Sequence, residues 1–182
     1  PIIRTLRTMP EFKARYQHCY FTRDWHPQDH CSFQSNHPGS TLFAPIVLEE
    51  TGVEQVMWPD HCVQGTDGAK FHAECQPSDT DIIISKGQDR RADSYSGFGS
   101  LPEVTSLLAD LQAKGVTKLY VVGLAYDYCV GSTAIDGAKH GFQTFLVSDA
   151  TKAVAPASAQ TMAARLREAG VTEITHEQVL LL

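Results

Sequence analysis

The chain has 182 residues, of which 42% are hydrophobic and 20% are charged, and its formal net charge is −6 at pH 7. This length and composition favour one globular domain with a single substantial core. The negative net charge and the lack of a Lys/Arg cluster exclude nucleic acid and anionic membrane surfaces as expected partners, and no apolar run is long enough to span a bilayer. The five cysteines are an odd, irregularly spaced set, which is typical of thiols in a cytoplasmic protein rather than of a disulfide framework.

The first 79 residues contain few regular patterns. Apolar residues at helical spacing predict a helix over 1–16, and a short apolar run predicts a strand over 19–22. Residues 25–79 are interrupted by proline and glycine, so we expect a long irregular region there. This region holds five of the eight histidines, and long irregular stretches inside a compact domain are usually functional.

From residue 81 onward, predicted strands and helices alternate. The strands span 81–86, 119–124, 144–148 and 172–175, and the helices span 104–114, 129–140 and 156–169. Ser100 and Glu103 have the spacing of a capping box at the start of the first of these helices. This alternation predicts an α/β fold, a three-layer α/β/α domain around a parallel central sheet.

A cysteine stands shortly after one of the predicted buried strands. The run at 119–124 is rich in β-branched residues, and helical spacing begins at Cys129. A thiol in the first turn of a helix faces unpaired N–H groups, which favour the thiolate. Lys86 ends another predicted strand, so we expect it above the same sheet edge, where it would lower the thiol pKa. Two alternatives remain open: Cys129 as a buried structural cysteine, and Lys86 as a lysine that leaves the sheet for water.

Asp24, His26 and His61 form a candidate metal-binding set. Asp24 and His26 are two residues apart beyond a predicted strand end, so their side chains point to the same side of an extended backbone. One carboxylate and two imidazoles suit a divalent metal, Zn²⁺ above all, with Fe²⁺ or Mn²⁺ as alternatives. An Asp-x-His pair is also common at surfaces and helix caps, so the set is a hypothesis.

Three motifs in order make the chain similar to a known family. They are DWHP at 24–27 with WPDHC at 58–62, KG at 86–87 with YSGF at 95–98, and VGLAYDYCV at 122–130. Together they resemble the nicotinamidases, members of the isochorismatase-like cysteine hydrolases. The resemblance runs from about residue 1 to about residue 170. It implies an isochorismatase-like, Rossmann-like fold and the hydrolysis of nicotinamide to nicotinate and ammonia, a step of NAD salvage.

The resemblance also implies a catalytic apparatus. Cys129 would be the nucleophile of an Asp–Lys–Cys triad and would form a thioester, and Lys86 would be the triad lysine. The backbone N–H groups of Ala125 and Cys129 would form the oxyanion hole, next to a cis peptide between Leu124 and Ala125.

Substrate and metal sites follow from the same resemblance. The metal ligands would be Asp24, His26 and His61, with His30 left open as a fourth. The residues that would line the pocket for a small pyridine amide are Trp58, Tyr95 and Tyr128.

One expected piece is missing from the sequence. Nicotinamidases begin with a strand that ends in Asp-x-Gln-Asn-Asp-Phe, and its first aspartate completes the triad. We therefore expect 1–182 to be a single domain truncated at its N-terminus.

Two alternatives to a nicotinamidase stay open: a related cysteine amidohydrolase with another amide substrate, which the metal set disfavours, and a catalytically dead binding or scaffold module. The oligomeric state is also open, a homo-oligomer included.

Overall fold

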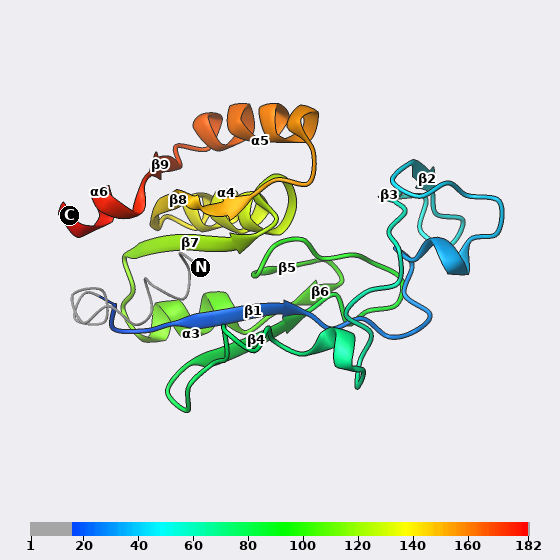
Figure 1. Cartoon of the computed structure of the whole chain (residues 1–182), viewed down its shortest axis with the longest axis horizontal. Coiled ribbons are helices and arrows are strands. Elements are labelled where there is room, and N and C mark those ends of the chain that lie inside the picture. The colour runs from blue at the N-terminus through cyan, green and yellow to red at the C-terminus, as the bar shows by residue number, and fades with distance from the viewer. Residues whose placement is uncertain (1–15, 182) are drawn as a thin grey trace.

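A computed structural model describes residues 16–181 of the chain (Figure 1). Its strands are β1 (Tyr20–Asp24), β2 (Pro45–Val47), β3 (Glu54–Val56), β4 (Ile82–Lys86), β5 (Gly99–Ser100), β6 (Glu103–Val104), β7 (Lys118–Leu124), β8 (Gln143–Lys152) and β9 (Thr172–Ile174). Its α-helices are α3 (Leu107–Ala113), α4 (Gly131–Lys139), α5 (Pro156–Glu168) and α6 (His176–Leu181). The short turns are η1 (Gln34–Asn36), η2 (Asp67–Ala69) and the π-helical η3 (Tyr126–Val130). No helix among these residues is long and apolar enough to cross a membrane.

Parallel strands form the centre of the fold, as predicted. β1 pairs with β4, and β7, β8 and β9 form a second parallel sheet in that order. In Figure 1, β1 and β7 point toward the same side of the molecule. The carboxyl ends of both sheets therefore face one region, which is where ligands bind in α/β proteins.

Side chains of β8 alternate between the two faces of their sheet. Phe145 and Val147 pack in a cluster with Val179 of α6, whereas Leu146 packs with Met162 of α5 and with residues of α4. This period of two is the geometry of any strand, and it requires helices on both faces. The third cluster buries α3 against β1 and β4, which completes the α/β/α layering.

The structure corrects the prediction of a capping box. Ser100 and Glu103 lie in the small β5–β6 hairpin, and α3 begins only at Leu107. The Glu103 carboxylate instead accepts hydrogen bonds from the backbone N–H groups of Gly87 (2.6 Å) and Gln88 (3.1 Å). The glutamate thus accepts from free N–H groups, as predicted, but these belong to the loop that follows β4 and not to a helix start.

Other differences concern short elements. The region predicted as irregular contains the antiparallel pair β2–β3, whose three-residue strands are too short for a periodic pattern. The helix α6 was not predicted, and the helix predicted over 1–16 lies outside the described residues except for its last residue. The helix predicted from Cys129 is preceded by the π-helical turn η3, so the cysteine lies in that turn rather than in the first turn of α4.

We predict that Leu146→Ala lowers the free energy of unfolding by about 2–5 kcal/mol, because the side chain is fully buried and its removal leaves a cavity. Urea unfolding followed by circular dichroism measures the change. Leu181→Ala is the matched control: Leu181 is 85% exposed, so its truncation should change stability by no more than about 0.5 kcal/mol. Equal effects of the two variants would contradict the described packing of β8.

Candidate active site

Cys129 lies on a turn that several backbone contacts hold in place. The turn η3 follows β7 through the peptide bond between Leu124 and Ala125, which is cis, as the resemblance implied. The Thr133 hydroxyl donates to the Cys129 carbonyl (2.6 Å) and accepts from the Gly97 N–H (2.8 Å). The turn that carries Cys129 is therefore tied to the loop that carries the YSGF motif.

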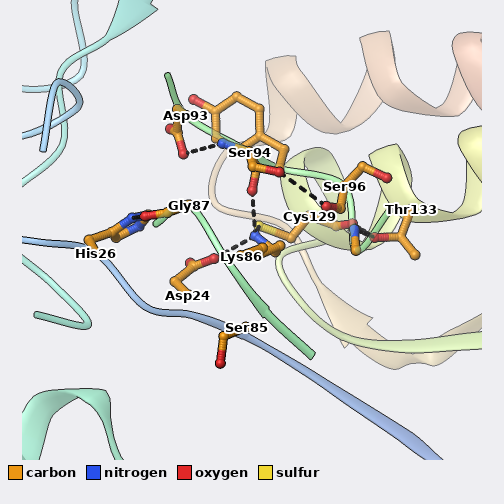
Figure 2. Close-up of polar contacts among 12 residues, drawn as sticks. Asp24, His26, Ser85, Lys86, Gly87, Asp93, Ser94, Ser96, Cys129 and Thr133 are labelled. Atoms are coloured by element: carbon orange, nitrogen blue, oxygen red, sulfur yellow. Dashed lines mark hydrogen bonds and ion pairs between the residues drawn. The ribbon is translucent and has the colours of Figure 1, made fainter. Parts of the chain in front are cut away.

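The ammonium group of Lys86 is buried beside the thiol. Its side chain is 2% exposed, and Nζ donates to Asp24 Oδ1 (2.5 Å), to the Ser94 carbonyl (2.7 Å) and to Cys129 Sγ (3.3 Å) (Figure 2). An ammonium has three donors, so each one has an acceptor. The structure thus brings Lys86 and Cys129 together, as predicted, and excludes the alternative of a lysine that leaves the sheet for water.

These charges shift one another's pKa values. Burial disfavours the charge on Lys86, but Cys129 and Asp24 outweigh burial and hold the pKa of Lys86 above its ordinary value. Burial likewise opposes the charge of Asp24, but Lys86 lowers the pKa of this carboxyl overall. The ion pair between Lys86 and Asp24 is therefore charged at neutral pH.

The thiol departs from our expectation. Burial raises the pKa of Cys129 to about 11, and the attraction of Lys86 offsets only part of this effect. We expected the lysine and a helix N-terminus to lower this pKa. The sign is opposite because desolvation of the sulfur is larger than its attraction to the lysine.

Asp24, His26 and His61 lie together, with their candidate ligand atoms within 4.8 Å of one another. Nδ1 of His26 is 2.7 Å from the Gly87 carbonyl, and Nδ1 of His61 is 2.8 Å from the Pro59 carbonyl. A ring nitrogen that donates to a carbonyl leaves the lone pair on Nε2, which is the usual arrangement of metal-binding histidines. Nε2 of His61 is 3.9 Å from Asp24 Oδ2. The predicted donor set therefore fits a divalent metal ion.

His30, which the sequence left open, is buried beside this set. Its ring centroid is 4.1 Å from that of His26, and its Nε2 has no hydrogen-bond partner among the described residues. Burial lowers the pKa of His30 to about 4, so the ring is neutral at pH 7. His26, His30 and Asp93 form a second group that could hold a metal. Both groups contain His26, whose Nδ1 contacts the Gly87 carbonyl, so only its Nε2 has a lone pair for a metal. The two groups therefore share one ligand atom.

The three aromatic side chains predicted to line the pocket are in mutual contact. Trp58 Nε1 donates to the Tyr95 hydroxyl (3.1 Å), and the ring of Tyr128 lies 4.8 Å from Trp58 and 5.4 Å from Tyr95, centroid to centroid. Tyr128 directly precedes Cys129 in the chain. The three rings therefore form one aromatic cluster, which Tyr128 joins to the turn that carries Cys129.

The structure adds residues that the sequence analysis missed. The Ser94 carbonyl accepts from Lys86, and the Gly87 carbonyl contacts His26, but backbone acceptors leave no signal in a sequence. Asp127 is buried within the motif that contains Cys129, and it accepts hydrogen bonds from the Val154 N–H, just before α5, and from the Ser158 hydroxyl. A buried carboxylate two residues before the cysteine could have been found in the motif itself.

Comparison with known proteins gives the same family as the motifs. The model of the isochorismatase domain matches residues 9–178. A nicotinamidase of Acinetobacter baylyi is 40% identical over 163 residues, which are 88% of this chain and 75% of that protein.

Two solved structures are close in fold. A nicotinamidase/pyrazinamidase of Acinetobacter baumanii has a TM-score of 0.88 and 35% identity, over 98% of this chain and 84% of that chain. The pyrazinamidase of Pyrococcus horikoshii, solved in complex with zinc, has a TM-score of 0.76 and 32% identity, over 96% and 84%. The chain therefore belongs to the isochorismatase family, as its three motifs predicted, and is a hydrolase of that family.

Proposed function

We propose that this chain is an amidohydrolase that converts nicotinamide and water to nicotinate and ammonia, with Cys129 as its nucleophile. The observation that carries the proposal is the buried ammonium of Lys86, which contacts the thiol and the Asp24 carboxylate at once. A buried ammonium that contacts a thiol is typical of catalytic sites, so this geometry favours an enzyme over a module that only binds partners. Nicotinamidases among the relatives that cover most of the chain support this choice of substrate.

The reaction would proceed in two steps through a thioester. In the first, the sulfur of Cys129 attacks the carboxamide carbon, the C–S bond forms, and the C–N bond breaks as ammonia leaves with the thiol proton. Lys86 Nζ, 3.3 Å from the sulfur, stabilises its developing negative charge. In the second step, water attacks the thioester carbonyl and the C–S bond breaks. One water proton returns to the sulfur of Cys129, and the other is released as the acid leaves as nicotinate.

The proposed oxyanion hole is formed by the backbone N–H groups of Ala125 and Cys129. Both belong to the turn that follows β7, so the atom that attacks and the donors that stabilise the product of attack would share one rigid segment. Such preorganised donors act where charge develops and need no rearrangement during the reaction.

Asp24 and the Nε2 atoms of His26 and His61 would hold a divalent ion, and we propose zinc because the Pyrococcus relative was solved with it. The donor set alone would also accept iron or manganese. When bound, the ion supplies a Lewis-acid contact for the pyridine nitrogen. Trp58, Tyr95 and Tyr128 would hold the aromatic ring, so that the carboxamide is oriented toward Cys129.

The first prediction tests the nucleophile. The parent chain should release ammonia from nicotinamide, and Cys129→Ala should abolish this release while the metal content stays unchanged, because the cysteine and the metal ligands belong to different segments. Ammonia is measured by a coupled assay and metal by elemental analysis. Turnover by Cys129→Ala near the parent rate would refute the nucleophile, and no release by the metal-loaded parent would favour a binding or scaffold module.

The second prediction concerns the metal. His61→Ala should lower metal stoichiometry and raise KM for nicotinamide, with little change in melting temperature, because His61 is partly exposed and its Nδ1 contacts only a loop carbonyl. His72→Ala is the control, since this exposed histidine of the same region is in neither metal group. A large drop in melting temperature with unchanged metal content would make His61 a structural residue.

The third prediction follows from the raised pKa of Cys129, about 11. Alkylation requires the thiolate, whose fraction grows about tenfold per pH unit below the pKa. The rate of Cys129 alkylation by iodoacetamide, resolved by peptide mass spectrometry, should therefore still be rising between pH 9 and 10. A plateau reached by pH 8 would show that Lys86 outweighs burial in the free protein.

A further inference from the structure

The side chain of Asp127 accepts hydrogen bonds from three donors. It lies in η3, two residues before Cys129, and is only 5% exposed. Its oxygens accept from the backbone N–H groups of Val154 (2.9 Å) and Ala155 (3.1 Å) and from the Ser158 hydroxyl (2.5 Å). All three donors belong to the start of α5 or to the residues just before it.

These contacts join two segments that are distant in the sequence. The free N–H groups at the start of α5 receive a carboxylate, which is the preferred partner of a helix N-terminus. The turn η3 and the start of α4 also pack tightly against α5. A Cβ added at Gly131 would come within 2.6 Å of the Met162 Cγ and of the Tyr126 carbonyl oxygen. A shift of the turn that carries the thiol would therefore break its hydrogen bonds to residues 154–158.

We propose that Asp127 is a positioning residue for the nucleophile: it fixes Cys129 Sγ at the 3.3 Å contact with Lys86 by anchoring η3 to α5. It touches neither the substrate nor the reacting atoms and acts only through the backbone of the turn. The proposal rests on Cys129 as the nucleophile of the proposed function. It assigns Asp127 a role in the rate of the chemical step, beyond its contribution to stability.

Asp127→Asn is the informative substitution because it keeps the size of the side chain. All three donors reach Oδ2, and the Val154 N–H also reaches Oδ1 at 2.9 Å. The amide has only one acceptor oxygen to replace these two. Even with its oxygen in the Oδ2 position, the amide would place its NH2 group against the Val154 N–H, 2.9 Å from it. Two donors repel each other at this distance, so we expect the turn to shift. Small displacements of a reacting group reduce rates steeply, by up to about a hundredfold for 1 Å.

A control substitution distinguishes the positioning role of Asp127 from a purely structural one. Asp149 also accepts from a helix start, the N–H of His176 (2.9 Å) and its ring. The helix α6 that it caps packs on β8. Asp149→Asn therefore loses a contact of the same kind, at a more exposed position, without touching η3. Any effect that it shares with Asp127→Asn reflects stability alone.

The experiment measures kcat, KM and site-resolved alkylation of Cys129 at pH 8 for both variants, in metal-loaded protein and well below the melting temperature. For Asp127→Asn we expect kcat to fall at least about tenfold with KM within about twofold. We expect its alkylation rate to differ at least about fivefold from the parent, because the burial of Sγ and its contact with Lys86 both depend on the turn. Asp149→Asn should match the parent in all three quantities.

Parent-like kcat and alkylation in folded Asp127→Asn would overturn the proposal, even if its melting temperature is lower. If that variant does not fold, Ser158→Ala decides, since it removes one of the donors: a fall in kcat of about twofold or more supports the proposal, and an unchanged kcat overturns it. The alkylation readout needs no nicotinamide. A parent that releases no ammonia therefore refutes the proposed function but leaves the positioning of Cys129 testable.

Discussion

The buried ammonium of Lys86 is the interaction on which the site depends. An ion of this kind costs several kcal/mol to bury unless it is paired and fully hydrogen-bonded. The parallel register of β1 and β4 places Asp24 opposite Lys86, and the loop after β4 returns the Ser94 carbonyl to the same nitrogen. One atom thereby fixes the relative positions of a strand end, a loop and the turn that carries Cys129.

Asp24 belongs to two parts of the site at once. Its Oδ1 pairs with Lys86, and its Oδ2 faces Nε2 of His61. A substitution of this residue would disturb the ammonium and the donor set together, so it cannot separate the role of the thiol from that of a metal. His61 and Cys129, which come from different segments, are the residues that can.

The parts of this arrangement that the sequence predicted are those that depend on local patterns. Apolar runs predicted β4, β7 and β8, and the rule that side chains meet beyond the carboxyl ends of parallel strands brought Lys86 and Cys129 together. The interpretation of Glu103 was wrong because capping-box spacing does not reveal which N–H groups lie nearby. Its actual partners, at Gly87 and Gln88, are neighbours only in the folded chain.

The pKa of the thiol and the contacts of Asp127 also depend on the folded chain, so local sequence patterns could not predict them. The sequence predicted an attractive lysine, but it carried no measure of how deeply the sulfur is buried, and burial decides the sign of the pKa shift of Cys129. Asp127 stands in the motif that identified Cys129, yet its partners are 27 to 31 residues further along the chain. The carboxylate and the sulfur of one turn thus have separate partners: backbone N–H groups just before α5 and the Ser158 hydroxyl stabilise the carboxylate and hold the turn, whereas the sulfur contacts the ammonium of Lys86.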